Sequence, residues 1–150
     1  MANTTVRWIG GKQFVGIDST HHSVVISTAD ENVGMKPSEL LLVALASCTA
    51  VDVVEILQKK RITLTSLEIE TTGEQDKENP WPFRKIHLAY RLRGENLDAK
   101  AVEQAIQLSE EKYCSVAATV RGVAEISYSY EILETATPQP AGGYAIPRQN

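Results

Sequence analysis

An α+β fold is predicted for this sequence from the order of its apolar patterns. Alternating apolar and polar residues, the pattern of half-buried strands, occur between residues 4 and 28 and again between 62 and 93. A long helical pattern separates these regions, and a shorter helical pattern and one more alternating stretch follow them. The expected order is therefore three strands, a long helix, two strands, a helix and a last strand.

The first three strands are expected in residues 4–28, where the alternation is interrupted by a turn at Gly10-Gly11. Short strands that follow one another in this way are expected to form a meander. The alternating apolar residues are Val6, Trp8, Val15, Ile17, Val24 and Ile26.

The long helix is predicted to begin at Pro37, because proline suits the first helical position, and Glu39 places negative charge in the first turn. At about 1.5 Å per residue, some 23 residues make it roughly 35 Å long. It is apolar nearly all round as far as Asp52, so we expect it to be deeply buried and the protein to be an obligate dimer. One face is marked by Leu41, Ala44, Leu45, Cys48, Val51 and Leu57.

Two strands, a helix and a final strand are predicted in the second half of the chain. Strand patterns cover residues 62–72 and 85–93, and the polar stretch 73–82 between them is interpreted as a loop. Asp98 can cap a helix that runs towards Cys114, where we expect it to break and resume as a short helix. The last strand contains Ile126, Tyr128, Tyr130 and Ile132.

Composition and charge describe one acidic domain. A chain of 150 residues that is 43% hydrophobic and 23% charged can bury a core. We expect the domain to cover residues 1–134 and to be followed by a Pro- and Gly-rich surface tail at 135–150. A net charge of −4 with scattered basic residues argues against a nucleic-acid partner. No secretory pattern and no apolar segment of roughly 20 residues is recognised, so a cytoplasmic protein with no membrane partner is expected.

The two cysteines, Cys48 and Cys114, each lie within an apolar helical pattern. They are too far apart in sequence for a CxxC motif, so joint chemistry requires the fold to bring two helices together. In a reducing cytosol a disulfide between them would be transient and catalytic rather than structural. From the residues alone, Cys48 as a small buried apolar residue remains an open alternative. A zinc site formed by Cys48, Cys114 and a histidine is disfavoured, because no pair of these ligands is closely spaced in the sequence.

Three segments around the cysteines carry a family resemblance. The first runs from Pro37-Ser38-Glu39-Leu40 to Ala46-Ser47-Cys48, and the second is Asp52-Val53-Val54-Glu55-Ile56-Leu57-Gln58-Lys59. The third is Glu111-Lys112-Tyr113-Cys114-Ser115-Val116-Ala117. On these segments the chain resembles the OsmC/Ohr family of hydroperoxide-reducing proteins, and within it the YhfA-like branch.

The resemblance implies an OsmC-like fold in an intertwined homodimer, with sheet from both subunits wrapped around long central helices. It implies a thiol peroxidase that reduces organic hydroperoxides in oxidative stress defence. Cys48 would attack the peroxide and become a sulfenic acid, and Cys114 would resolve it to a disulfide. A dithiol, from a lipoyl protein or a small thiol, would then regenerate the enzyme without a cofactor.

The sequence departs from the family where the attacking thiol is activated. Active members use an arginine of the early strand loop, paired with a glutamate that follows the proline opening the long helix. Here that loop carries Lys12 and no arginine, and Ser38 follows Pro37, with the carboxylate one position later at Glu39. Lys12 and Glu39 are the candidates for these two roles, although a lysine lacks the bidentate fork of arginine.

His21 and His22 offer a second route to activation. They lie at the start of the third predicted strand, where alternation directs one ring inward. An inward histidine near Cys48 could stabilise a thiolate or carry its proton, whereas the alternative is a surface pair in a turn. The missing arginine also leaves a second function open, namely a non-enzymatic protein of the same fold that binds a small apolar ligand at the dimer interface.

Overall fold

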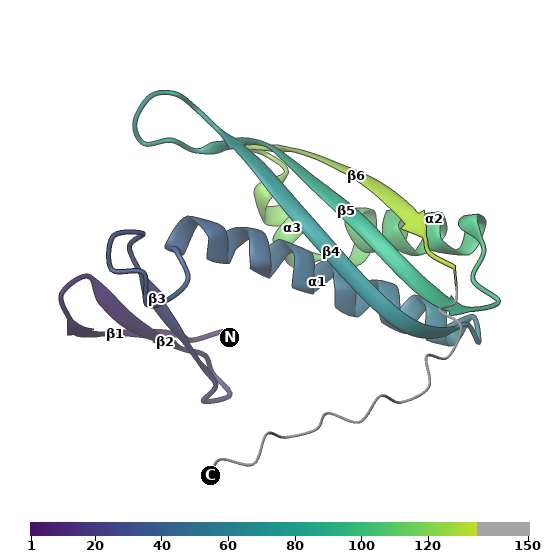
Figure 1. Ribbon diagram of the computed structural model, residues 1–150, viewed down its shortest axis with the longest axis horizontal. Helices are drawn as coiled ribbons and strands as arrows, with labels where there is room; N and C mark the ends of the chain where they lie inside the picture. Colours follow the sequence, from purple (N-terminus) through teal and green to yellow (C-terminus); the bar gives the residue numbers. More distant parts are fainter. Residues whose placement is uncertain (135–150) are drawn as a thin grey trace, which may run out of the picture.

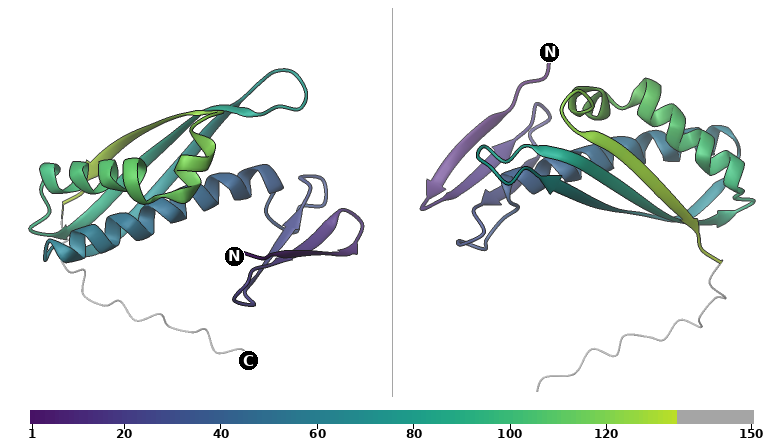
Figure 2. Two further views of the ribbon diagram at one scale, coloured as in Figure 1. Left: turned by 180° about the vertical axis from the view of Figure 1, so that it is seen from behind. Right: turned by 90° about the horizontal axis from the view of Figure 1, so that it is seen from above.

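The computed structural model describes residues 1–134, and the predicted tail at 135–150 lies outside the described residues. The described chain contains two three-stranded sheets, which one long helix connects (Figure 1). A layer of short helices packs with the long helix against the second sheet (Figure 2).

The first sheet is the predicted meander of β1 (Thr5–Gly10), β2 (Gln13–Ile17) and β3 (Ser23–Ser27), with both pairs antiparallel. Gly10 and Gly11 both have positive φ angles, of 118° and 52°, which explains why glycines occupy the first turn. Within the described residues this sheet makes few contacts with the rest of the protomer, and it lies beyond the first turn of the long helix (Figures 1 and 2).

The long helix, α1 (Pro37–Lys59), has the predicted first residue and length, with 23 residues. Leu45, Thr49, Val53 and Leu57 form its buried face, and their spacing of four residues places them on one side of the helix. The expectation of deep burial all round is wrong for the protomer. Leu41 and Val51, which the sequence placed on the buried face, are 40% and 59% exposed, because no element of the described protomer covers that side.

The apolar character of α1 also corrects the expectation that no segment approaches a membrane-spanning length. By length and composition α1 could cross a bilayer, with a mean hydropathy of 2.2 over 18 residues. Its buried face, however, packs in the core with β5 and α2. Burial in this core accounts for part of the apolar composition, since 22% of that window is buried in the described protomer.

The second sheet contains β4 (Thr63–Gln75), β5 (Phe83–Glu95) and β6 (Glu125–Ile132) in that order. β4 pairs antiparallel with β5, whereas β6 runs parallel to β5. Strand β4 continues beyond its predicted end at residue 72, so the loop predicted at 73–82 is shorter and begins at Asp76. The buried residues of β5 are those the alternation predicted, namely Ile86, Leu88, Tyr90 and Leu92.

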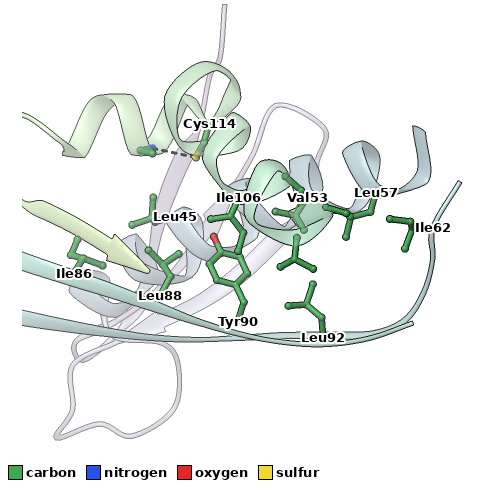
Figure 3. Packing of buried hydrophobic residues seen from close by; sticks show 14 of the residues in the cluster. Leu45, Val53, Leu57, Ile62, Ile86, Leu88, Tyr90, Leu92, Ile106 and Cys114 are labelled. Atoms are coloured by element: carbon green, nitrogen blue, oxygen red, sulfur yellow. Dashed lines mark hydrogen bonds between the residues drawn. The ribbon is translucent and has the colours of Figure 1, made fainter. Parts of the chain in front are cut away.

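The helical layer contains α2 (Ala99–Leu108), the π-helical turn η1 (Ser109–Tyr113) and α3 (Ser115–Val120). Asp98 caps α2 as predicted, with its carboxylate accepting a hydrogen bond from the Ala101 amide at 2.8 Å. The predicted break at Cys114 is confirmed, because this residue separates η1 from α3. Residues of α1, β5 and this layer form one core, which reaches Cys114 at its upper edge (Figure 3).

Candidate active site

The fold brings the two cysteines together. Cys48 lies in the middle of α1, and Cys114 lies between η1 and α3. Both are free thiols, and the Cys48 thiol lies close enough to Cys114 to contribute to the raised pKa of the Cys114 thiol. The joint chemistry that the sequence left dependent on the fold is therefore geometrically available.

Cys114 is buried and held in place by backbone donors. Its side chain is 2% exposed, and its Sγ accepts a hydrogen bond from the Ala117 amide at 3.3 Å, which caps α3. Burial, followed by the nearby Cys48 thiol, raises the pKa of the Cys114 thiol to about 11, and the backbone amides of Ala117 and Val116 only partly oppose this rise. Cys114 is therefore protonated near neutral pH and is poorly suited to be the first nucleophile.

Cys48 lies at a boundary on the surface of α1. On one side are the buried residues Leu45 and Thr49, and on the other is the exposed Val51. Cys48 itself is partly exposed. A reagent that approaches the exposed side of α1 therefore meets Cys48 before it meets the buried Cys114.

Polar groups lie beneath the cysteine pair at the interface between sheet and helices. Tyr90 extends from β5 towards the helical layer (Figure 3). Its hydroxyl lies close to the Thr49 side chain. Burial raises the pKa of Tyr90, so this hydroxyl stays neutral and can donate a hydrogen bond. Burial also raises the pKa of Glu110, against the opposing effect of the nearby Arg121.

Residues 28–129 match the family model described as OsmC-like protein. The chain belongs to this family. The protein YhfA of Escherichia coli K12 is 36% identical to this OsmC-like chain over 128 residues, which cover 85% of the chain and 96% of YhfA. The sequence resemblance to the OsmC/Ohr family is thus confirmed, and this relative supports the YhfA-like branch.

Solved structures support the OsmC-like α+β fold. A hypothetical protein from Aquifex aeolicus VF5 has a TM-score of 0.81 and 31% identity, with 90% of this chain and 98% of that chain covered. The organic hydroperoxide resistance protein OhrB of Bacillus subtilis has a TM-score of 0.60 and 18% identity, with 87% and 98% covered. At that identity the likeness to OhrB concerns the fold alone.

The predicted activating residues of this OsmC-like protein do not meet Cys48 within the protomer. Lys12 lies in the turn between β1 and β2, where its Nζ is 3.6 Å from the Asp30 carboxylate. Glu39 forms an ion pair with Lys36 at the start of α1, and Cys48 lies roughly 13 Å further along the helix axis at about 1.5 Å per residue.

His21 and His22 are both exposed, in the turn before β3, so neither ring is directed inward in the protomer. Asp18 organises this turn, since its carboxylate accepts hydrogen bonds from the Thr20 hydroxyl and the His22 amide, each at 2.9 Å. The Thr20 hydroxyl also lies 2.8 Å from Nδ1 of His22. In the protomer, His21 and His22 therefore form the surface pair in a turn that the sequence left open as the alternative.

An open groove of about 740 Å³ runs between the first half of α1 and β4. Its floor is apolar, and polar groups that include Glu39 and Gln75 lie along its sides. Neither cysteine lines it. The apolar lining residues are Leu42, Val43, Ala46, Ala50, Leu67, Ile69 and Phe83.

Among residues 1–134, no group of three or more His, Cys, Asp or Glu residues is placed to hold a metal ion. Sequence reasoning missed several polar residues around the cysteines, including Tyr90, Thr49 and Ser109. A signal for Ser109 was present, because it continues the spacing of Val102 and Ile106 on the buried face of α2. A polar residue at such a position needs a buried partner.

Proposed function

We propose that this protein is a cysteine-based thiol peroxidase that reduces organic hydroperoxides. The proposal is carried by two free thiols that the fold brings near each other, Cys48 partly exposed and Cys114 buried with a raised pKa to which Cys48 contributes. Membership in the OsmC-like family supports it, and so does the fold shared with OhrB, whose name records organic hydroperoxide resistance.

The chemistry takes two steps at the cysteine pair. The Cys48 thiolate attacks the terminal oxygen of ROOH, which breaks the O–O bond and gives a Cys48 sulfenic acid and the alkoxide RO⁻, which takes a proton from water to leave as the alcohol ROH. The Cys114 thiol then attacks the Cys48 sulfur, so that an S–S bond forms and the sulfenic hydroxyl leaves as water with the thiol proton. A dithiol reductant, from a lipoyl protein or a small thiol of the cytoplasm, returns both residues to thiols by exchange.

The proposed active form is an intertwined homodimer. In the protomer the first sheet has little to pack against, and Val6 and Trp8 of β1 are exposed, as are Leu41 and Val51 of α1. A second copy that wraps its sheet around α1 would cover these apolar surfaces. Such wrapping would also allow Lys12, His21, His22 and Glu39 to act on a cysteine pair across the interface.

A second candidate function is supported by the groove between α1 and β4. Its volume and apolar floor suit a small apolar ligand, and the early loop offers Lys12 where active relatives use arginine. In this alternative the cysteines stay reduced and the dimer binds a ligand without turnover.

Mass spectrometry of the intact protein after one equivalent of cumene hydroperoxide distinguishes the two functions. The peroxidase loses two hydrogen atoms as the Cys48–Cys114 disulfide forms, and a dithiol reverses the change. A binding protein keeps its reduced mass under the same pulse. Unchanged mass in fully reduced, folded protein would contradict the peroxidase proposal.

A further inference from the structure

A short chain of hydrogen bonds joins the two cysteine-bearing elements. Asp52 follows Cys48 by one turn on α1, and its carboxylate accepts a hydrogen bond from the Ser109 hydroxyl at 2.7 Å. The carbonyl of Ser109 in turn accepts a hydrogen bond from the Cys114 amide at 2.8 Å. Ser109 is thus bonded to α1 by its side chain and to Cys114 by its backbone.

The position of Ser109 explains how these hydrogen bonds can control where Cys114 lies. Ser109 is fully buried and is the first residue of the π-helical turn η1. The bond from the Cys114 amide to its carbonyl spans five residues and closes that turn. The location of Cys114 relative to the helix therefore depends on where Ser109 is held.

Asp52 fixes Ser109 from the helix that carries Cys48. The residues Cys48 and Asp52 are four apart on α1, so they lie on the same face, one above the other. A hydroxyl donor to a carboxylate forms a strong, short hydrogen bond, especially where water is partly excluded. The same rigid helix thus holds one thiol directly and the other through Ser109.

We propose that Asp52 and Ser109 are positioning residues that hold Cys114 against Cys48 for disulfide formation. The step they assist converts a Cys48 sulfenic acid and a Cys114 thiol into a disulfide and water, with no further oxidant. Disulfide formation driven by peroxide rests on the function proposed above. Disulfide formation driven by glutathione disulfide is independent of that function, because it needs only the two thiols and releases two glutathione thiols.

The test uses the full-length protein with either end of the hydrogen bond removed, as Ser109→Ala or Asp52→Ala. Asp52→Asn serves as the conservative variant, since its amide oxygen can still accept from Ser109. Ser47→Ala is the matched control, because Ser47 is an exposed neighbour of Cys48 whose hydroxyl, among residues 1–134, bonds only to the Ala44 carbonyl of its own helix.

The first measurement is the equilibrium between the dithiol and the Cys48–Cys114 disulfide in glutathione buffers, read by mass spectrometry. We expect Ser109→Ala and Asp52→Ala to shift this equilibrium at least tenfold towards the dithiol, because the effective concentration of one thiol at the other falls. Asp52→Asn and Ser47→Ala are expected to stay within threefold of the parent.

The second measurement separates positioning from simple stabilisation. After one equivalent of cumene hydroperoxide, Cys48 sulfenic acid should form at the parental rate in Ser109→Ala, while closure to the disulfide slows about tenfold. If the parent protein does not react with peroxide, the peroxidase proposal is rejected. The glutathione equilibrium then decides whether Asp52 and Ser109 are positioning residues.

Circular dichroism and thermal melting of each variant identify any that does not fold. Ser109→Ala removes a single oxygen and Asp52 is more exposed, so the two breaking variants carry separate risks of unfolding. The hydrogen bond would be only structural if Ser109→Ala or Asp52→Ala folds and keeps both its exchange equilibrium and its closure rate within twofold of the parent. This holds even if the variant has a lower melting temperature. That outcome would overturn the proposal.

Discussion

The thiol of Cys114, at the start of α3, lies close enough to the thiol of Cys48, in the middle of α1, for Cys48 to help raise its pKa. This proximity joins two elements whose sequence separation gives no local reason for them to meet. The two thiols differ in their surroundings, because Cys114 is buried and Cys48 is partly exposed. The difference assigns the attacking role to Cys48 and the resolving role to Cys114 in the proposed reaction.

Substitution of each cysteine tests that assignment. We expect Cys48→Ser to abolish hydroperoxide consumption, because the remaining thiol, Cys114, is buried and its raised pKa keeps it protonated near neutral pH. Cys114→Ser should still undergo one fast oxidation, to a sulfenic acid that dimedone traps, but should not turn over with a dithiol. Consumption of hydroperoxide is measured with dihydrolipoamide as reductant. Full steady-state turnover by Cys114→Ser would refute the resolving role.

The raised pKa of Cys114 predicts an unusual dependence of its alkylation on pH. Below its pKa the thiolate fraction rises tenfold per pH unit, so labelling by iodoacetamide should keep rising to about pH 11 rather than level off near the ordinary value of 9.0. Peptide mass spectrometry of wild-type protein measures labelling at Cys114 alone. A plateau of the Cys114 rate at pH 9 would show that burial does not hold the proton.

The same shift has a consequence for stability. Between the ordinary pKa and the raised one, the folded protein binds more protons at Cys114 than the unfolded chain does. The contribution of Cys114 to the free energy of unfolding is therefore complete below pH 9.0 and is lost as pH rises to about 11. Comparison of wild type with Cys114→Ser in urea across this range isolates the effect.

Much of the fold could be predicted because its local signals agree. Pro37 sets the start of α1, Asp98 caps α2, and the alternation through Leu88 and Tyr90 predicts the buried face of β5. The covering of α1 could not be predicted in the same way. An apolar residue such as Val51 has the same sequence signal whether its cover comes from its own protomer or from another copy.

The candidate site was predictable only in part. The cysteines stood out by residue type and by their flanking segments, but the Asp52–Ser109 hydrogen bond depends on a π-helical turn that no periodicity indicates. The roles expected of Lys12 and His22 depend on which sheet reaches Cys48. Which sheet reaches Cys48 is set by how two protomers assemble, and the local sequence does not indicate this.

Activation of Cys48 across a dimer can be tested by neutralising one candidate at a time. If Lys12 supplies the positive charge, Lys12→Met should slow sulfenic acid formation about tenfold in a Cys114→Ser background, whereas Lys100→Met, an exposed control on α2, should not. His21→Ala and His22→Ala are examined in the same assay, which follows dimedone trapping by stopped quench. Parental rates in all three candidate variants would remove these residues from the mechanism and strengthen the ligand-binding alternative.

The exposed side of α1 provides the test of assembly. Val51 is 59% exposed in the protomer, and a lysine at an exposed helical position changes the free energy of unfolding by no more than about 0.5 kcal/mol. In a dimer that buries this side of α1, the same lysine would lose its hydration, at a cost of several kcal/mol. We therefore expect Val51→Lys to dissociate or destabilise the protein, and Gln58→Lys, at an exposed position near the end of the helix, to leave it unchanged. Light scattering and analytical ultracentrifugation at micromolar concentration measure the outcome, and a folded wild-type monomer that tolerates Val51→Lys would exclude the intertwined dimer.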